Sequence, residues 1–412
     1  MSATKKILIA GACIFPEGSG GAVRCMHMLA KGFAANGHHV EVATTYGADT
    51  YKRRIEMDGF VAYSFGLLHD LNKLSLVKKL KSHLKLMIYL IYLTVKKRYD
   101  IIFFYGPGPA FVYVGLLAKI MKRRVAYLMA DIQPKTANMK ISGKLKRLQA
   151  NIVDISLANI SDLVVILGTS KLVRRYARFA PKSSRVQILA PVDTDMFASG
   201  NGNSFREKYG LKGKEIVTYS GALDKLDGIH ILIEAIKSVA QKHPNVVLVI
   251  AGSTGDIDRV VGKMLDFKLL AQEHGVADFT IFTGHLQMQN VIDLLNASNV
   301  LVMPKIDHPL NHAASPIKIA EYLAAGRPIV TSRICELDRH LTHKEHVYFC
   351  ESGNTIELTD AINFVLENEA LSLKLSKNAS SISKVLFDYR TITGTIYERA
   401  FITEEANKWL NA

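Results

Sequence analysis

The segment from Ser315 to Gly326 carries residue types that are well placed to bind an anion. Ser315 predicts a helix N-cap, Pro316 suits the first helical position, and Gly326 predicts a left-handed cap at the helix end. The free amides and the positive dipole end of such a helix favour a phosphate. Lys318 adds an ammonium group in the first turn. The pattern therefore predicts a helix start that binds phosphate.

Glu321 is the one charged residue in the apolar stretch that follows, three positions after Lys318. A carboxylate on a helix that packs against a sheet needs hydrogen-bond donors to offset its desolvation. Two hydroxyl groups of a ribose would supply such donors. The alternative is a glutamate that is exposed to solvent or paired only with Lys318, which lies on the same helix face.

Strand-like apolar runs alternate with helical patterns in both halves of the chain, which is typical of βαβ units and parallel sheets. In the first half we expect strands at 6–10, 40–44, 101–105, 125–128 and 163–166, with helices at 21–36, 110–121 and 144–160. In the second half we expect strands at 215–219, 246–251, 279–282, 300–303, 329–331 and 347–349. The sequence therefore predicts the α/β class, with two doubly wound, Rossmann-like domains.

The boundary between these domains is expected near residues 190–204. Pro191 and the glycine- and asparagine-rich run 199–204 interrupt the pattern there and suggest a hinge. The aromatic-rich end, residues 388–412, suggests a helical segment that covers a surface of the first domain. We therefore expect one domain of residues 1–192 plus 388–412 and a second of residues 193–387.

The net charge of +15 belongs to the first half of the chain. Residues 1–200 contain 30 Lys and Arg against 12 Asp and Glu, whereas the remainder contains 22 against 25. This asymmetry suggests a polyanionic partner, either nucleic acid or an anionic lipid surface, and solvated lysines are the alternative. No nucleic-acid recognition motif accompanies the charge, so we expect no nucleic-acid partner.

Residues 76–98 have basic clusters on both sides of the apolar run 86–93. That run is shorter than the ~20 residues that cross a bilayer. A helix with basic flanks and tyrosines suits a protein lying on an anionic membrane, and a helix buried against the sheet fits the same pattern.

The four cysteines are far apart and form no C-x-x-C pair, so we expect reduced thiols and no zinc site. The short apolar run after Lys6 lacks the features of a signal peptide, which favours a cytoplasmic location. The D-x-D spelling at Asp193 and Asp195 lies at the domain junction, where we expect helix caps and no metal site.

The order Ser315-Pro-x-Lys318-x-x-Glu321-Tyr-x-Ala-Ala-Gly326-x-Pro-Ile-Val resembles the donor-site signature of the retaining glycosyltransferase family four. The resemblance is to members that build bacterial cell-surface polysaccharides. It implies the GT-B fold, with two Rossmann-like domains facing across a cleft. The second domain would bind the nucleotide-sugar donor and the first would face the acceptor. Glu321 would then bind the ribose, while Ala314, Ser315, Pro316 and Lys318 would lie at the diphosphate.

Further segments resemble the family in the same chain order. They are Gly18-Ser-Gly20-Gly21 in the N-terminal glycine loop, Gly37-His38 before the second strand, Val192-Asp193 at the junction, the glycine turn with Gly221 and Lys225, and Phe282-Thr-Gly284-His285 near the nucleotide base. Asp131, before Pro134, resembles an element on the acceptor side and is otherwise an ordinary turn residue. The resemblance implies catalytic roles for Asp131, Lys318 and Glu321.

The chain departs from the family at three positions. Ala313 stands where many relatives have a second glutamate, and Ala222 and Asp227 stand where many have Arg and Lys in the glycine turn. Either Lys225 or Lys318 would then neutralise the diphosphate.

The implied activity is a retaining hexosyltransferase that moves a sugar from a UDP- or GDP-sugar to a glycan or a lipid-linked acceptor. The nucleotide sugar is a co-substrate, and we expect no further cofactor and no metal. The enzyme would be cytoplasmic and peripheral on the inner face of the plasma membrane. A non-hydrolysing sugar-nucleotide 2-epimerase and a non-catalytic nucleotide-binding relative are the alternatives.

Overall fold

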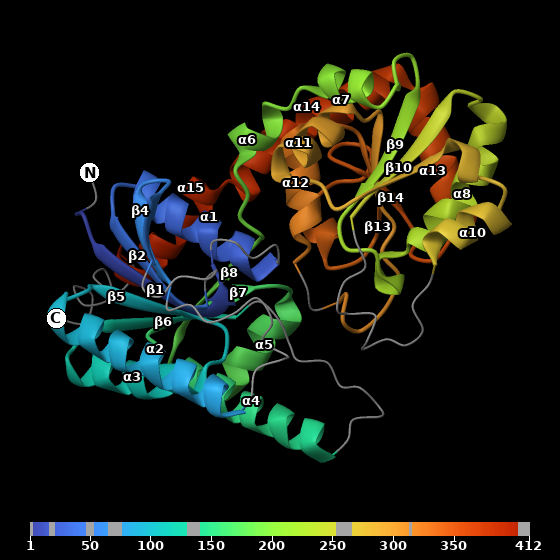
Figure 1. Ribbon diagram of the computed structural model, residues 1–412. Helices are drawn as coiled ribbons and strands as arrows, with labels where there is room; N and C mark the ends of the chain where they lie inside the picture. The colour runs from blue at the N-terminus through green and yellow to red at the C-terminus, as the bar shows by residue number, and fades with distance from the viewer. Residues whose placement is uncertain are drawn as a thin grey trace. The chain divides into compact units, whose positions relative to one another are not determined.

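The chain divides into two compact units in a computed structural model that describes residues 3–15, 21–46, 53–64, 76–129, 141–252, 266–312 and 315–402. The first unit comprises residues 1–191 and 389–412, and the second comprises residues 192–388. Both units are α/β, with helices packed around a sheet whose strands are mainly parallel (Figure 1).

The first unit has an eight-stranded sheet in the order β3-β4-β2-β1-β5-β6-β7-β8. The strands are β1 (Lys6–Ile14), β2 (His39–Tyr46), β3 (Arg53–Met57), β4 (Phe60–Ser64), β5 (Ile101–Tyr105), β6 (Arg124–Met129), β7 (Leu163–Leu167) and β8 (Ser184–Ile188). Among the described strands of this unit, only β3 is antiparallel to its neighbour. The central strands are apolar along their whole length because helices bury both faces of the sheet.

Four helices cover one face of this sheet, namely α2 (Leu76–Lys96), α3 (Pro109–Ile120), α4 (Ile141–Ile160) and α5 (Ser170–Phe179). On the other face lie α1 (Gly21–Ala35) and α15 (Tyr389–Tyr397), and the chain continues into the π-helical turn η5 (Glu398–Ile402). The C-terminal segment thus belongs to the first unit and packs against α1. No helix within the described ranges is long and apolar enough to cross a membrane.

Three strands of the first unit were not expected from the sequence. Two of them, β3 and β4, form a hairpin with Asp58 (φ 46°) and Gly59 (φ 81°) at its turn. The Asp-Gly pair is a hairpin signal that the sequence analysis missed. The edge strand β8 was also missed, because its residues Ser184–Ile188 are only partly apolar. Moreover, β1 extends to Ile14, beyond the expected end at residue 10.

The second unit has a parallel six-stranded sheet in the order β11-β10-β9-β12-β13-β14. The strands are β9 (Glu215–Ser220), β10 (Val246–Ala251), β11 (Thr280–Gly284), β12 (Val300–Met303), β13 (Ile329–Ser332) and β14 (Tyr348–Cys350). In chain order this is the 3-2-1-4-5-6 arrangement of a Rossmann fold, so the strand order reverses between β9 and β12.

Helices cover both faces of the second sheet. They include α8 (Ile229–Lys242), α10 (Phe267–Glu273) and α13 (Thr355–Glu367) on one face, with α7 (Gly202–Lys208) and α11 (Met288–Ala297) on the other. Next to α11 lies α12 (Ile317–Ala325), which packs against α14 (Glu369–Leu386).

The expected hinge at residues 199–204 is instead packed structure within the second unit. Helix α6 (Thr194–Ala198) is capped by Asp193, whose carboxylate accepts a hydrogen bond from the Met196 amide at 3.0 Å. This confirms the expected capping role of Asp193. Gly200 and Gly202 lie so close to Asn296 that an added Cβ would approach it to within 3 Å. Glycine is needed here for close packing, so the interpretation as a flexible linker was wrong.

Candidate functional site

The candidate site lies at the point where the strand order of the second sheet reverses. Gly221 directly follows β9, and Lys305 follows β12 after Pro304. In open α/β sheets, the crevice at the carboxyl ends of the strands at such a switch point is the usual ligand site. Lys318, in the first turn of α12, joins this edge through its contact with Gly221.

Two lysines from different elements converge on one buried aspartate. Lys318 Nζ lies 2.8 Å and Lys305 Nζ lies 2.7 Å from Oδ1 of Asp227. Asp227 ends the short 3-10 helix η2 (Lys225–Asp227), and only 4% of its surface is exposed. Lys318 also donates a hydrogen bond to the Tyr219 hydroxyl at 2.6 Å. We call Lys305, Lys318 and Asp227 the lysine–aspartate cluster.

The pKa values of the cluster reflect burial and mutual charge. Burial would raise the pKa of Asp227, but the two ammonium groups hold it well below its usual value. Burial lowers the pKa of Lys318, and the positive charge of Lys305 adds to this. For Lys305 the attraction of Asp227 outweighs burial and raises the pKa. Nearby Asp224 has a pKa raised to about 6 by burial and by the charge of Asp227. Below that pH Asp224 is neutral and two cations face one anion, which favours an anionic ligand, whereas above it a second carboxylate balances the charge.

Gly221 and Tyr219 position Lys318. Gly221 has φ 151°, and a Cβ added to it would lie 2.6 Å from Lys318 Cε and 2.7 Å from Nζ. Lys318 Nζ also lies 4.4 Å from the centre of the Tyr219 ring, whose hydroxyl donates to the Ala222 carbonyl at 2.6 Å. The absence of a side chain at Gly221 is therefore required by the position of the lysine.

Helix α12 is fixed to the end of β9 through Tyr322. The Tyr322 hydroxyl accepts a hydrogen bond from the Ser220 amide at 2.7 Å and donates one to the Ser220 carbonyl at 3.2 Å. The adjacent Glu321 is 6% exposed, which excludes the alternative of a solvent-exposed glutamate. The structure thus brings a buried carboxylate and a lysine into the first two turns of one helix at the switch point.

The ends of α12 differ slightly from expectation. The N-cap is Pro316 and the helix begins at Ile317, so the prediction of Ser315 as N-cap and Pro316 as first helical residue was wrong by one position. The extended backbone of Pro316 (φ −72°, ψ 117°) causes the shift. Ser315 is half-buried and Pro316 is buried before the helix start. Gly326 has φ 63° at the C-cap, which confirms the predicted left-handed cap.

Asn311 holds the end of β12 in place. Its amide nitrogen donates to the carbonyls of Leu226 and Ile306 at 3.0 and 2.9 Å, and its Oδ1 accepts from Lys305 at 3.2 Å. The Cys335 thiol donates to the Asn311 carbonyl at 2.9 Å. The turn after β9, the end of β12 and the segment after β13 are thereby connected around the lysine–aspartate cluster.

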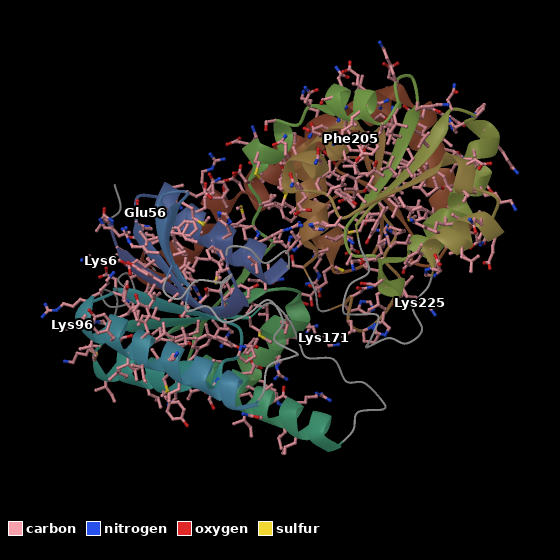
Figure 2. All side chains as sticks on the ribbon, viewed as in Figure 1. Lys6, Glu56, Lys96, Lys171, Phe205 and Lys225 are labelled. Atoms are coloured by element: carbon pink, nitrogen blue, oxygen red, sulfur yellow. The ribbon has the colours of Figure 1, made fainter. Side chains whose placement is uncertain are left out.

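Gly221 and Gly284, both expected in the site, lie at the carboxyl ends of β9 and β11, the two strands that flank β10 in the sheet. The Gly221 amide donates to the Ala251 carbonyl and the Gly252 amide donates to the Gly284 carbonyl, each at 2.9 Å. His285 follows Gly284 and is exposed. Lys225, labelled in Figure 2, lies in η2 and is also exposed, so its ammonium group is not part of the buried cluster.

Some predicted site residues lie outside the described part of the chain. These are Gly20, Asp131 and Ala314, together with Ala313. Gly21 is the first residue of α1 in the first unit. Cys25, Cys335 and Cys350 are buried free thiols, as expected.

Sequence reasoning missed Lys305 and Asp224. Lys305 directly follows an apolar strand and a proline, a position at the carboxyl edge of the sheet that was a usable signal. Asp224 accepts a hydrogen bond from the Asp227 amide at 3.1 Å. Aspartate is common in turns because of such local hydrogen bonds, so its presence there gave no signal of a functional site.

A cavity of about 600 Å³ lies at the other edge of the second sheet, near the residues that precede β12 and β13. Its lining includes Arg206, Asn299 and Arg327. Arg206 donates to the carbonyls of Leu211, Lys214 and Ala297 and to Asn299 Oδ1. We place the functional site at the opposite, carboxyl edge, because ligands of open α/β sheets bind outside the carboxyl ends of the strands at the switch point.

The second unit contains a recognisable family region. Residues 202–381 match the family model of glycosyl transferases group 1. Glycogen synthase of Mycobacterium tuberculosis is 25% identical over 253 residues, which cover 61% of this chain and 56% of that protein. The chain thus spans little more than half the length of this curated relative.

Solved structures establish the fold over nearly the whole chain. HepE of Anabaena, solved in complex with UDP, has a TM-score of 0.68 at 19% identity and covers 95% of this chain and 98% of its own. Sucrose-phosphate synthase of Thermosynechococcus elongatus has a TM-score of 0.73 at 19% identity, with 97% and 100% covered. The likeness shows two Rossmann-like parallel-sheet units, the GT-B fold, and confirms the α/β fold class expected from the sequence.

Proposed function

We propose that this chain is a glycosyltransferase that takes a sugar from a nucleotide-sugar donor bound at the carboxyl edge of the second unit. The observation that carries the proposal is the lysine–aspartate cluster beside Gly221, with the buried Glu321 one turn deeper on the helix of Lys318. Two ammonium groups suit a diphosphate, and a buried carboxylate suits the hydroxyls of a ribose. The group 1 family match over residues 202–381 supports the same assignment.

UDP-sugars are the donors we propose first. The Anabaena HepE structures, which share the fold, contain UDP and UDP-glucose. Gly284 and His285, at the end of β11, are the residues we assign to the side of the base.

The proposed chemistry depends on electrostatic stabilisation of the leaving nucleoside diphosphate. Lys318 and Lys305 would neutralise the charge that develops on the leaving phosphate, and Glu321 would hold the ribose so that the donor stays in position. The bond between the anomeric carbon and the diphosphate oxygen breaks, the acceptor oxygen bonds to that carbon on the same face, and the hydroxyl proton passes to the leaving diphosphate, so the configuration is retained. We assign the acceptor, a glycan or a lipid-linked sugar of cell-surface polysaccharide synthesis, to the first unit, and Asp131 to the acceptor side.

Titration calorimetry with UDP tests the donor site. Glu321→Ala is expected to weaken UDP binding by about a hundredfold or more, because charge-assisted hydrogen bonds to the ribose are lost. Glu273→Ala, at the exposed end of α10, is the matched control and should bind UDP like the natural chain. Equal affinities in both variants, with unfolding temperatures unchanged, would remove the assignment.

Product analysis separates transfer from its alternatives. UDP-glucose incubated with and without a lipid-linked acceptor should give UDP release that depends on the acceptor. A sugar-nucleotide 2-epimerase would alter the donor without any acceptor, and a non-catalytic relative would bind UDP and release nothing.

A further inference from the structure

Three neighbouring helices of the first unit expose large apolar side chains at helical spacing. On α2 these are Leu84, Ile88, Tyr92 and Val95, on α3 they are Tyr113, Leu116 and Ile120, and on α4 they are Leu145, Leu148 and Ile152. Their exposed fractions run from 47% for Val95 to 79% for Ile120. Neighbours in each set are three or four residues apart, so each set forms one stripe along its helix.

The stripes lie on the side of the helices opposite the sheet. Leu86, Leu90 and Leu93 of α2 and Val114 of α3 are fully or almost fully buried in the core against the sheet strands, as is Leu157 of α4. Figure 1 shows α2, α3 and α4 side by side on one face of this sheet, and α3 contacts both of the others. The ten exposed side chains therefore lie on the outer side of three adjacent helices, and we call this surface the three-helix face. Apolar surfaces of this extent mark sites of protein or membrane contact.

The charges on these helices have almost one sign. The helix sequences contain five lysines in α2, one in α3, and two lysines and an arginine in α4. Lys85 and Lys96 are exposed, and Figure 2 labels Lys96 at the end of α2. Lys119 pairs with Asp162, which offsets its charge.

The single acidic residue of the three helices does not face solvent. Asp154 is 3% exposed, lies 3.0 Å from the Arg175 guanidinium and accepts hydrogen bonds from the hydroxyls of Tyr127 and Tyr176. The three-helix face is thus apolar with a basic border and without an exposed carboxylate from its own helices.

We propose that the three-helix face lies on an anionic lipid bilayer, with the apolar stripes among the acyl chains and the lysines at the headgroups. Charge decides between this partner and a second copy of the chain, because two such faces would bring their lysines together, whereas anionic headgroups complement them. The inference extends the basic helix 76–98 noted in the sequence to α3 and α4. It rests on the proposed function only in that a membrane surface would present a lipid-linked acceptor.

Co-sedimentation with vesicles, in the absence of nucleotide, tests the proposal on the full chain. The protein should pellet with vesicles of phosphatidylcholine and phosphatidylglycerol at low salt, and much less with phosphatidylcholine alone. The variant Ile88→Ser/Ile120→Ser/Leu148→Ser removes one exposed apolar side chain from each helix and should lower the partition coefficient by about tenfold or more. Ile356→Ser/Leu373→Ser, at exposed positions of the second unit, is the matched control and should bind like the natural chain.

The outcomes separate this proposal from the proposed function. UDP affinity, measured by calorimetry in parallel, should be the same in the natural chain and in the triple variant. Failure of the natural chain to bind anionic vesicles, or equal binding by the triple variant, would overturn the proposal of a membrane surface. Neither result would affect the proposed donor site. A dimer in sedimentation velocity that the triple variant converts to monomer, without vesicle binding, would assign the face to a second copy.

Discussion

Lys305 Nζ lies 2.7 Å from Asp227 Oδ1, joining the end of β12 to the turn after β9. Asp227 stands where the resemblance places a lysine in the glycine turn. The ammonium group that this turn lacks is therefore supplied from the neighbouring strand end, and Asp227 serves to hold it beside Lys318.

Replacement of Lys305 tests its role in the site. Lys305→Met keeps most of the side-chain volume but leaves Asp227 paired with Lys318 alone. UDP affinity is expected to fall by about tenfold to a hundredfold, the equivalent of losing one charge-assisted hydrogen bond and one positive charge. Calorimetry with UDP measures the change. Lys237→Met, at an exposed position of α8, provides the control, and an equal effect of both substitutions would argue against Lys305 as a site residue.

Gly221→Ala tests the contact between the glycine turn and Lys318. The new Cβ would lie 2.6 Å from Lys318 Cε, so the lysine must move, and UDP affinity should fall together with stability. Gly213→Ala is matched because Gly213 also has a positive φ, 75°, but has no atom within 4 Å of an added Cβ. It should lower the unfolding temperature without changing UDP affinity. If Gly221→Ala behaves in the same way, Lys318 does not depend on the glycine.

The titration of Asp224 is expected to make donor binding depend on pH. Its pKa is raised to about 6, so the side chain is neutral below that pH and adds a negative charge above it. The diphosphate of UDP-glucose does not titrate in this range. Affinity is therefore expected to fall between pH 5 and pH 7.5, on the order of fivefold, or about 1 kcal/mol. In Asp224→Asn, which keeps an acceptor for the Asp227 amide, the profile should be flat, and a fall of the same size in that variant would refute the assignment.

The same shift affects stability with a defined sign. Because the folded pKa of Asp224 is higher than its ordinary value of 3.8, the folded state binds more protons between about pH 4 and pH 6. Its contribution to the free energy of unfolding is present below that window and is lost as the pH rises through it. The free energy of unfolding of Asp224→Asn, measured with urea across this pH range, should lack this pH-dependent contribution.

The packing of α15 on α1 depends on Gly32. An added Cβ would lie 2.5 Å from the Tyr389 carbonyl oxygen and 2.6 Å from Thr393 Oγ1. Gly32→Ala is expected to destabilise the first unit by about 1–3 kcal/mol, measured by urea unfolding, and to expose the C-terminal segment to proteolysis. Gly394→Ala is matched, since its nearest atom, Asn36 Nδ2, is 3.9 Å away, and it should be neutral or stabilising by roughly 0.5–1 kcal/mol. Equal stability of both variants would show that α1 and α15 can move apart at Gly32 without a measurable loss of stability.

The local sequence pattern predicted much of the fold. The runs at 101–105, 246–251 and 300–303 coincide with β5, β10 and β12, because a central parallel strand is apolar on both faces. The edge strands β3 and β8, and β4 next to β3, were not expected, since short strands with polar residues have a weak apolar pattern. The glycine-rich run at 199–204 suggested a hinge because sequence cannot distinguish glycine used for flexibility from glycine used for close packing.

The sequence by itself determined the local features: which strands are buried, the left-handed cap at Gly326, and an isolated carboxylate three residues after a lysine on an apolar helix. Only the tertiary structure decided that Lys305 and Lys318 share Asp227, and that three helices with exposed apolar stripes are neighbours. The physical reason is that charge pairing and surface continuity depend on which strand ends and helix faces are neighbours. Strand order and helix packing set those neighbours, and no local periodicity encodes them.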